Sequence, residues 1–323
     1  MSIDGIVEDL RSYRGISRKQ GVSELARKLL RAPEGNVFAN FGEDAAAIEL
    51  GDSILLLAAD GIMEDLINAN PYWAGYCSVL VNVNDIAAMG GMPLALVDIV
   101  SCGEGPIRDR LADGMRAASD KFGAPIVGGH LHPDTSYAAL DVAVLGETDQ
   151  KHLVRSSGAV PGDAVILAID LDGEFTHCIP YSWDTTSTKD SDEVRRGLAS
   201  MHAVAPMLSA GKDISNPGSL GTIGMLLEAS GAGGRINIGS VPRPDGVELM
   251  QWLKAYQGCG FVVTCEHAST DSIIGEFSRR GLTAAVCGSV VEGQKLIVEL
   301  DGDTAVLFDF SRDTLGCRHP QRI

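Results

Sequence analysis

The sequence predicts a two-domain α/β (α+β) protein, and three observations lead to this fold class. The chain has 323 residues, which exceeds the usual size of one domain. Short apolar runs typical of strands alternate with helical stretches along its whole length. A polar, turn-rich segment interrupts this order at residues 147–163. We therefore expect one domain over residues 1–150 and a second over residues 151–323.

The first half opens with an amphipathic helix, GVSELARKLLRA, and its apolar spacing predicts Val22, Leu25, Leu29 and Leu30 on the buried side. Apolar runs separated by turn residues then predict two strands over 45–50 and 53–59. The remaining elements expected here are a nearly all-apolar helix over 71–89, a buried strand over 94–102, an amphipathic helix over 108–123, and strands over 125–129 and 137–147.

The second half repeats the strand-and-helix order without repeating the sequence. The patterns predict strands over 165–171, 260–265, 284–291 and 295–300, and helices over 191–210 and 219–231. Cys259 and Cys265 fall in an apolar segment and are expected in the core. The order is that of an α/β or α+β domain.

Charge and composition exclude several classes of protein. The net charge of −17 argues against nucleic-acid binding, which needs a basic face. No apolar run approaches the roughly 20 residues that span a bilayer, and the first residues lack the order of a signal peptide. The seven cysteines are scattered without a CxxC pair, as in proteins with reduced thiols. We expect a cytoplasmic protein without a membrane or nucleic-acid partner.

Two aspartates stand at the ends of predicted strands. Asp44 lies in Gly-Glu-Asp-Ala-Ala directly before a strand, and Asp60 ends the apolar strand SILLLAA. Either residue could belong to an ordinary turn, Asp44 by capping backbone N–H groups and Asp60 in an Asp-Gly hairpin. A carboxylate at the carboxyl end of a buried strand is also well placed to meet a ligand.

A third aspartate lies on the predicted apolar helix. Ser78, Asn82 and Asp85 are spaced by four and three residues, so they share one face. Burying a carboxylate is costly unless it is paired or binds a metal. Asp85 is therefore either satisfied by Asn82, Asn84 or a helix terminus, or it is a metal ligand.

Two further motifs carry polar groups at element ends. Gly128-Gly129-His130 follows a strand, and glycines of this kind let backbone N–H groups approach a phosphate. Asp213 lies in KDISNPGSLG, which reads either as a helix cap or as a set of polar ligands. Together, the four aspartates and the glycine pair favour Mg²⁺ bridging a nucleotide, because carboxylate oxygens are hard ligands.

Five motifs, in this order, resemble the aminoimidazole ribonucleotide (AIR) synthase superfamily, which includes selenophosphate synthetase, thiamine-monophosphate kinase and a hydrogenase maturation factor. The matching segments are FGEDAAAI, NPYWAGYCSVLVNVNDIAAMGGMPLALVDIV, VGGHLHPDTSYAALDVAVLGE, LVRSSGAVPGD and KDISNPGSLG.

The resemblance implies a two-domain PurM-like fold, a homodimer formed through the first domain, and ATP with Mg²⁺ in a cleft near the dimer interface. It implies Mg²⁺ ligation by Asp44, Asp60, Asp85 and Asp213, nucleotide contacts from Asn82, Asn84, Gly128, Gly129 and His130, and Asp213 and His130 as candidate catalytic residues. The expected activity is ATP-dependent phosphoryl transfer that activates a small metabolite.

Departures from the named branches leave the substrate open. No cysteine precedes Cys77, which argues against selenide activation. His130 follows the glycine pair where thiamine-monophosphate kinase has Asp-Thr-Thr, and Asn216-Pro217 replaces the second aspartate of its Asp-Ile-Ser-Asp motif. That kinase activity and a non-catalytic, nucleotide-binding regulatory or assembly role stand as alternatives.

Overall fold

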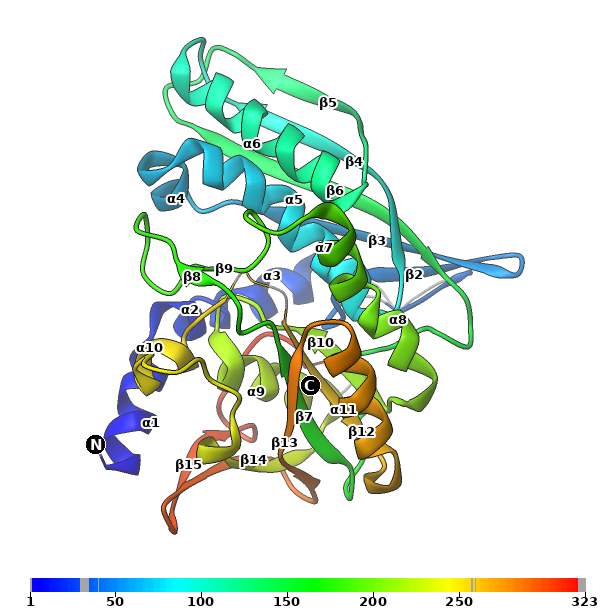
Figure 1. The fold of residues 1–323 in the computed structure, drawn as a ribbon, viewed down its shortest axis with the longest axis vertical. Helices are drawn as coiled ribbons and strands as arrows, with labels where there is room; N and C mark the ends of the chain where they lie inside the picture. Colours follow the sequence, from blue (N-terminus) through cyan, green and yellow to red (C-terminus); the bar gives the residue numbers. More distant parts are fainter. Residues whose placement is uncertain (1, 30–34, 40, 257, 259, 319–323) are drawn as a thin grey trace.

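Two mixed sheets form the framework of the protein, as the computed structural model shows in Figure 1. The structure describes residues 2–29, 35–39, 41–256, 258 and 260–318. The first sheet has the order β1-β2-β3-β6-β4-β5 and the second the order β10-β12-β7-β13-β11-β14-β15. The strands of the first sheet are β1 (Val37–Ala39), β2 (Ala46–Leu50), β3 (Ser53–Gly61), β4 (Met92–Ser101), β5 (Ile126–His132) and β6 (Ala139–Thr148). Those of the second are β7 (Ala164–Ile169), β10 (Ala210–Asp213), β11 (Gly233–Asn237), β12 (Gly260–Cys265), β13 (Thr283–Val291), β14 (Lys295–Leu300) and β15 (Asp303–Asp309).

Helices cover these two sheets, and a short hairpin forms a separate two-stranded sheet. The helices are α1 (Ile3–Ser12), α2 (Arg14–Ser17), α3 (Gln20–Leu29), α4 (Glu64–Ala69), α5 (Pro71–Ala88), α6 (Pro106–Phe122), α7 (Ser191–Leu198), α8 (Ser200–Val204), α9 (Gly218–Ser230), α10 (Leu249–Leu253) and α11 (Thr270–Arg279). The hairpin pairs β8 (Glu174–Phe175) with β9 (Trp183–Asp184). This mixed α/β architecture confirms the predicted fold class.

Helix α5 is the central element, because it packs against the first sheet on one side and the second domain on the other (Figure 1). Asn70 caps its first turn and Pro71 occupies the first helical position. Its buried side chains share one core with residues of β7 and β12. A helix that is apolar on nearly every side needs such a position between two layers. The few polar residues of α5 therefore lie between the two sheets.

Close packing holds α5 against α6. A Cβ added at Gly114 of α6 would lie 1.9 Å from the carbonyl oxygen of Tyr72, and one added at Gly75 of α5 would lie 2.1 Å from that of Leu111. Only glycine permits this approach. The two helices together cover one face of the first sheet.

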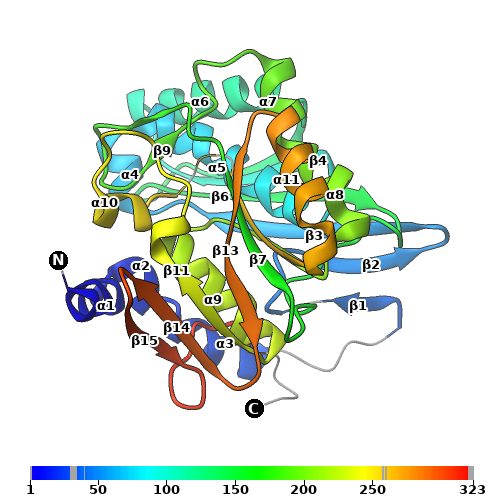
Figure 2. The same cartoon turned by 60° about the horizontal axis from the view of Figure 1, so that its bottom comes forward.

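The second sheet carries its own core on the face away from α5. Helix α9 covers part of this face, and α1 packs beside β15 (Figure 2). Ile3, Ile6 and Leu10 of α1 belong to this core. Arg11 of α1 donates hydrogen bonds to the carbonyl oxygen of Leu307 at 2.7 Å and to Asp313 at 2.9 and 3.0 Å. The first helices of the chain therefore belong to the second sheet's core.

Three predictions about local structure are wrong. Leu25 and Leu29 of α3 are exposed rather than buried, and of their predicted partners the Val22 side chain and Leu30 lie outside the described residues. Strand β4 buries one face only, because no layer covers the other. The helix predicted over 191–210 is divided at Ala199 into α7 and α8, and α8 ends at Val204, shortly before Pro206, which lacks the N–H that a continuing helix needs.

The cysteines agree with the prediction where the structure describes them. Among the described residues the structure has no disulfide at Cys77, Cys102, Cys178, Cys265, Cys287 or Cys317, and Cys265 is buried as expected. Cys259 lies outside the described residues. Within the described part of the chain, no helix has the length and apolar character needed to cross a membrane. The cytoplasmic location stays a prediction.

Candidate functional site

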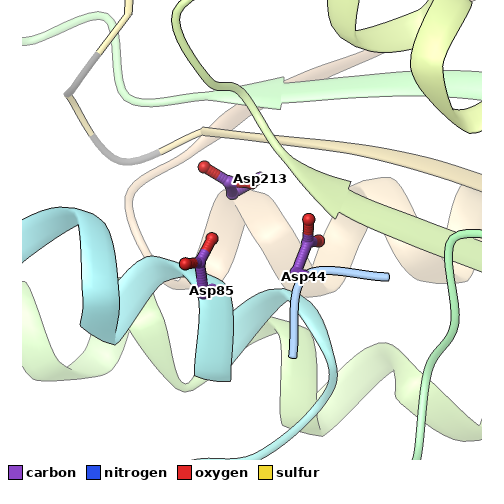
Figure 3. Close-up of side chains that lie close together, drawn as sticks. All are labelled: Asp44, Asp85 and Asp213. Carbon is purple, nitrogen blue, oxygen red and sulfur yellow. The ribbon is translucent and has the colours of Figure 1, made fainter. Parts of the chain in front are cut away.

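Three aspartates from distant parts of the chain converge between the two sheets (Figure 3). Asp44 comes from the segment before β2, Asp85 from the last turns of α5, and Asp213 from the end of β10. Each offers a carboxylate oxygen, and these oxygens all lie within 4.8 Å of one another. This arrangement brings together side chains from both sheets and from the helix between them.

Asp60 borders the same region. It lies in β3 opposite Val142 of β6, so it is not part of a hairpin turn. It lines a cavity together with Asp213 and Asn84. Asp60 keeps solvent-exposed surface, but desolvation by the walls of this recess and then the neighbouring Asp213 raise its pKa to about 6. The fourth predicted aspartate thus belongs to the same electrostatic cluster.

Asp85 is the most strongly perturbed member of the cluster. Burial raises its pKa well above the usual value, and Asp60 and Asp213 raise it further. The neighbouring amides do not satisfy its carboxylate, because Asn82 donates to the carbonyl oxygen of Ser78 at 2.8 Å and Asn84 to that of Gly258 at 3.3 Å. The structure therefore does not support the alternative in which these asparagines pair with Asp85.

The ordinary structural roles considered for Asp44 and Asp213 are also absent. Oδ1 of Asp44 pairs with the ammonium of Lys212, and its Oδ2 is buried without a hydrogen-bond partner among the residues that the structure describes. Helix α9 begins after Pro217 with no side-chain cap, so Asp213 does not cap it. Oδ1 of Asp213 is buried, has no hydrogen-bond partner in the described part of the chain, and lies 3.6 Å from Nζ of Lys212.

This donor set fits a divalent cation. Buried carboxylate oxygens without partners are costly, and a hard cation would satisfy them. A bound cation would also reduce the mutual repulsion among the carboxylates. Lys212 lies among these carboxylates, and its ammonium contacts Asp44 and Asp213. Asp44, Asp85 and Asp213 could therefore hold Mg²⁺, with Asp60 beside them.

The structure places the glycine pair and His130 elsewhere. Gly128, Gly129 and His130 belong to β5, an edge strand of the first sheet. Gly129 and His130 line a groove between β5 and α6. None of the four clustered aspartates (Asp44, Asp60, Asp85 and Asp213) lines this groove. Asn84 lines the aspartate cavity, whereas Asn82 is fully buried one turn away. A single copy of the chain thus does not bring His130 beside Asp213.

Sequence reasoning assigned no role to three cations at this site. Lys212 was part of the KDISNPGSLG motif, and its ammonium meets Asp44 and Asp213. Arg18 and Lys19 line the cavity from the turn after α2. The available signal for Lys212 was a lysine beside an aspartate in an apolar setting. The turn after α2 carried no such signal, because its position depends on tertiary packing.

Family comparisons agree with this architecture. Residues 42–148 match the model of the AIR synthase related protein N-terminal domain, and residues 161–301 match that of the C-terminal domain. The chain belongs to the AIR synthase-related family. This AIR synthase-related protein is 39% identical to an uncharacterized protein of Methanocaldococcus jannaschii, over 98% of this chain and 100% of that relative. It is 26% identical to the phosphoribosylformylglycinamidine synthase subunit PurL of Methanopyrus kandleri, over 87% of this chain and 42% of the subunit.

Solved structures share the PurM-like fold of this AIR synthase-related protein. Thermotoga maritima PurL complexed with ATP superposes with a TM-score of 0.73 at 17% identity, over 95% of this chain and 53% of PurL. A ThiL structure complexed with AMPPCP and TMP gives a TM-score of 0.62 at 19% identity, over 87% of this chain and 92% of ThiL. The chain therefore spans about half of PurL and most of ThiL.

Proposed function

We propose that this protein binds ATP with Mg²⁺ and transfers the γ-phosphoryl group to a small metabolite. The observation that carries the proposal is the convergence of Asp44, Asp85 and Asp213, because among the described residues a buried carboxylate oxygen of Asp44 and one of Asp213 lack a hydrogen-bond partner. Structural neighbours complexed with ATP or AMPPCP support the nucleotide, and the aspartates support the metal.

In this proposal each group at the site has a physical task. Mg²⁺ supplies charge neutralisation for the phosphates. Asp44, Asp85 and Asp213 hold the metal, and Asp60 adds negative charge beside it. The acceptor's hydroxyl or amine bonds to the γ-phosphorus, the bond to the β–γ bridging oxygen breaks, and ADP leaves. The acceptor proton passes to solvent.

A homodimer is part of the proposal. The face of the first sheet opposite α5 and α6 is apolar and exposed, with Leu57, Met92, Val97, Ile99 and Leu145 between 36 and 47% accessible. An apolar face of this kind is typical of a protein interface. His130 pairs with Ile99 in the parallel register of β5 and β4. A second copy bound to this face would lie close to Gly128, Gly129 and His130. In such a dimer, we propose that these three residues contact the nucleotide.

Calorimetry with Mg²⁺ and the non-hydrolysable analogue AMPPCP tests the nucleotide site. Asp213→Asn should weaken Mg²⁺-dependent binding at least tenfold, because it removes a ligand charge from the metal. Asp52→Asn is the matched control, since Asp52 lies in an exposed turn between β2 and β3, and it should bind like the wild type. Equal binding by all three proteins would contradict the proposed site.

Turnover separates an enzyme from a binding protein. The wild type should release ADP when ATP, Mg²⁺ and a pool of small metabolites are supplied together, and Asp213→Asn should not. Thiamine monophosphate is one member of the pool, because a ThiL complex is among the structural neighbours. Tight AMPPCP binding without ADP release across the pool would favour a regulatory or assembly role instead.

A further inference from the structure

The aspartate cluster opens into a cavity of about 270 Å³ that has charges of both signs. Asp60 and Asp213 stand on one side, and Arg18 and Lys19 come from the turn after α2. Protein sites for drug-sized ligands are usually larger, at roughly 300–1,000 Å³. A cavity of this size can hold a small metabolite.

Tight backbone packing fixes the position of the two cations. A Cβ added at Gly15 of α2 would lie 2.4 Å from the carbonyl oxygen of Asn216, so α2 rests directly on the loop that follows Asp213. Ile16 is buried against the start of α9 near Gly221. Arg18 and Lys19 thus extend from an anchored turn and not from a free terminus.

Internal ion pairs do not account for these cations. Neighbouring basic residues are paired, since Arg11 bonds Asp313 and Arg14 lies 3.4 Å from Asp65. Within the part of the chain that the structure describes, neither Arg18 nor Lys19 forms an ion pair within 4.0 Å, although both line a cavity that contains two carboxylates. They are close enough to stabilise the charged form of Asp60, and yet they remain available to an anion.

Uncharged polar atoms complete the other side of the cavity. Within the described residues, Asn84 Oδ1 and Ser215 Oγ are buried without a hydrogen-bond partner, and both residues line the cavity. Asn216 and Tyr256 also line it. An acceptor oxygen such as Asn84 Oδ1 suits a hydroxyl or amine donor. The cavity therefore offers two cations from the turn after α2, and neutral polar groups from residues close to Asp85 and Asp213 in the chain.

We infer that the acceptor is a small anionic metabolite. Its carboxylate or phosphate group binds Arg18 and Lys19, and its hydroxyl or amine meets Asn84 and Ser215, facing the metal cluster. The inference rests on the proposed function and adds the chemical class of its second substrate. Guanidinium and ammonium groups in a recess are the usual protein partners for such anions.

Binding of two probes tests this assignment. Inorganic phosphate and glycolate are titrated separately into the full chain saturated with Mg²⁺ and AMPPCP. The double variant Arg18→Gln/Lys19→Gln should lose at least tenfold in affinity for the tighter of the two probes, and thermal melts verify that it is folded. Arg14→Gln is the matched control on the adjacent helix α2, and it should bind like the wild type.

Each outcome decides the question. Preference for phosphate or for glycolate identifies the anionic group of the acceptor. Unchanged probe binding in the double variant, or no binding of either probe to the wild type, overturns the inference. A tenfold loss of AMPPCP affinity in the double variant overturns it too, because the cations would then hold the nucleotide. Failure of the wild type to bind Mg²⁺ and AMPPCP is a different result, which refutes the proposed function itself.

Turnover provides a second, independent measurement. Hydroxy acids are compared with their uncharged methyl esters, and hydroxyl-bearing phosphate monoesters with their uncharged dimethyl triesters, as acceptors in the ADP-release assay. Anionic forms should be at least tenfold better than the esters in kcat/KM, and the double variant should lose this preference mainly through KM. Equal use of acids and esters would contradict the inference.

Discussion

At the residue scale, Lys212 acts as an internal counter-ion of the aspartate cluster. Its side chain is 7% exposed and that of Asp44 is 1% exposed, so their ion pair is almost completely removed from water. A buried charge needs a partner, and removal of one partner is strongly destabilising. In the protein without metal, this lysine is the cation that Asp44 contacts directly.

Replacing Lys212 should therefore reveal how strongly the buried carboxylates of the cluster destabilise the folded protein. Lys212→Met is expected to lower the free energy of unfolding by about 3 kcal/mol without Mg²⁺. Millimolar Mg²⁺ should recover a larger share of stability in the variant than in the wild type, because the ion replaces the lost charge. Urea unfolding at pH 7.5 with and without Mg²⁺ measures both effects.

The control for this variant is Lys295→Met. Lys295 is 55% exposed and lies 3.9 Å from Asp309, so its loss should change stability by less than about 0.5 kcal/mol. An Mg²⁺ response of Lys212→Met no larger than that of the wild type would show that Lys212 does not compete with a metal.

The perturbed pKa of Asp60 predicts a pH-dependent response to Mg²⁺. Its value is about 6 in the folded protein against 3.8 ordinarily. Between these values the unfolded chain releases the proton while the folded chain retains it, so this group lowers stability as pH rises, and its cost is complete above pH 6. Mg²⁺ binds the ionised form, so its affinity should rise over the same range.

Thermal melting tests this sign. Mg²⁺ should raise Tm by several degrees more at pH 7.5 than at pH 5, and Asp60→Asn should flatten the difference. Asp52→Asn keeps the cluster intact and should retain it. A response to Mg²⁺ that is equal at the two pH values would contradict the role given to Asp60.

At the element scale, the interface between α5 and α6 depends on a glycine contact. Gly114→Ala should destabilise the protein by about 3 kcal/mol, since its Cβ would meet the Tyr72 carbonyl oxygen at 1.9 Å and the backbones would have to separate. Gly21→Ala in α3 is the matched control. No atom lies within 4 Å of a Cβ there, so alanine should be neutral or add up to about 1 kcal/mol. Thermal unfolding compares the two, and equal effects would contradict the packing argument.

Elements with a strong internal pattern were predictable from the sequence. Helix α5 begins at Pro71 after a capping asparagine, and the sequence marks both its start and its glycine-rich end. Periodicity could not show which side of an element remains uncovered. Apolar spacing is the same whether or not another part of the chain covers the apolar side chains. The sequence therefore predicts both faces of β4 and Leu25 in the core, although one face of β4 and Leu25 are exposed.

The candidate site was only partly predictable for a related reason. Asp44, Asp85 and Asp213 each stand out as polar groups beside apolar elements, and the structure places their oxygens together. Arg18 and Lys19 occupy an unremarkable polar stretch of sequence. Their position follows from the contact of Gly15 with Asn216, 201 residues further along the chain. Contacts of this length leave no local pattern.

At the scale of the whole molecule, the open face of the first sheet predicts self-association. Ile99→Glu should convert the proposed dimer to a monomer, because it places a charge at the centre of an apolar face. Val306→Glu on β15 is the control, since Val306 is 41% exposed but lies on the second sheet. Analytical ultracentrifugation measures the mass. A monomeric wild type, or a dimeric Ile99→Glu, would contradict the proposed interface.

The contact between Arg11 and Leu307 spans 296 residues and has a consequence for how the chain is made. Synthesis proceeds from the N-terminus, so α1 leaves the ribosome long before β15 exists. Its apolar side, with Ile3, Ile6 and Leu10, therefore remains uncovered while the first sheet assembles, because β15 has not yet been synthesised. The second core therefore closes last, and the interval before it closes is when a nascent chain is most exposed to aggregation or to chaperones.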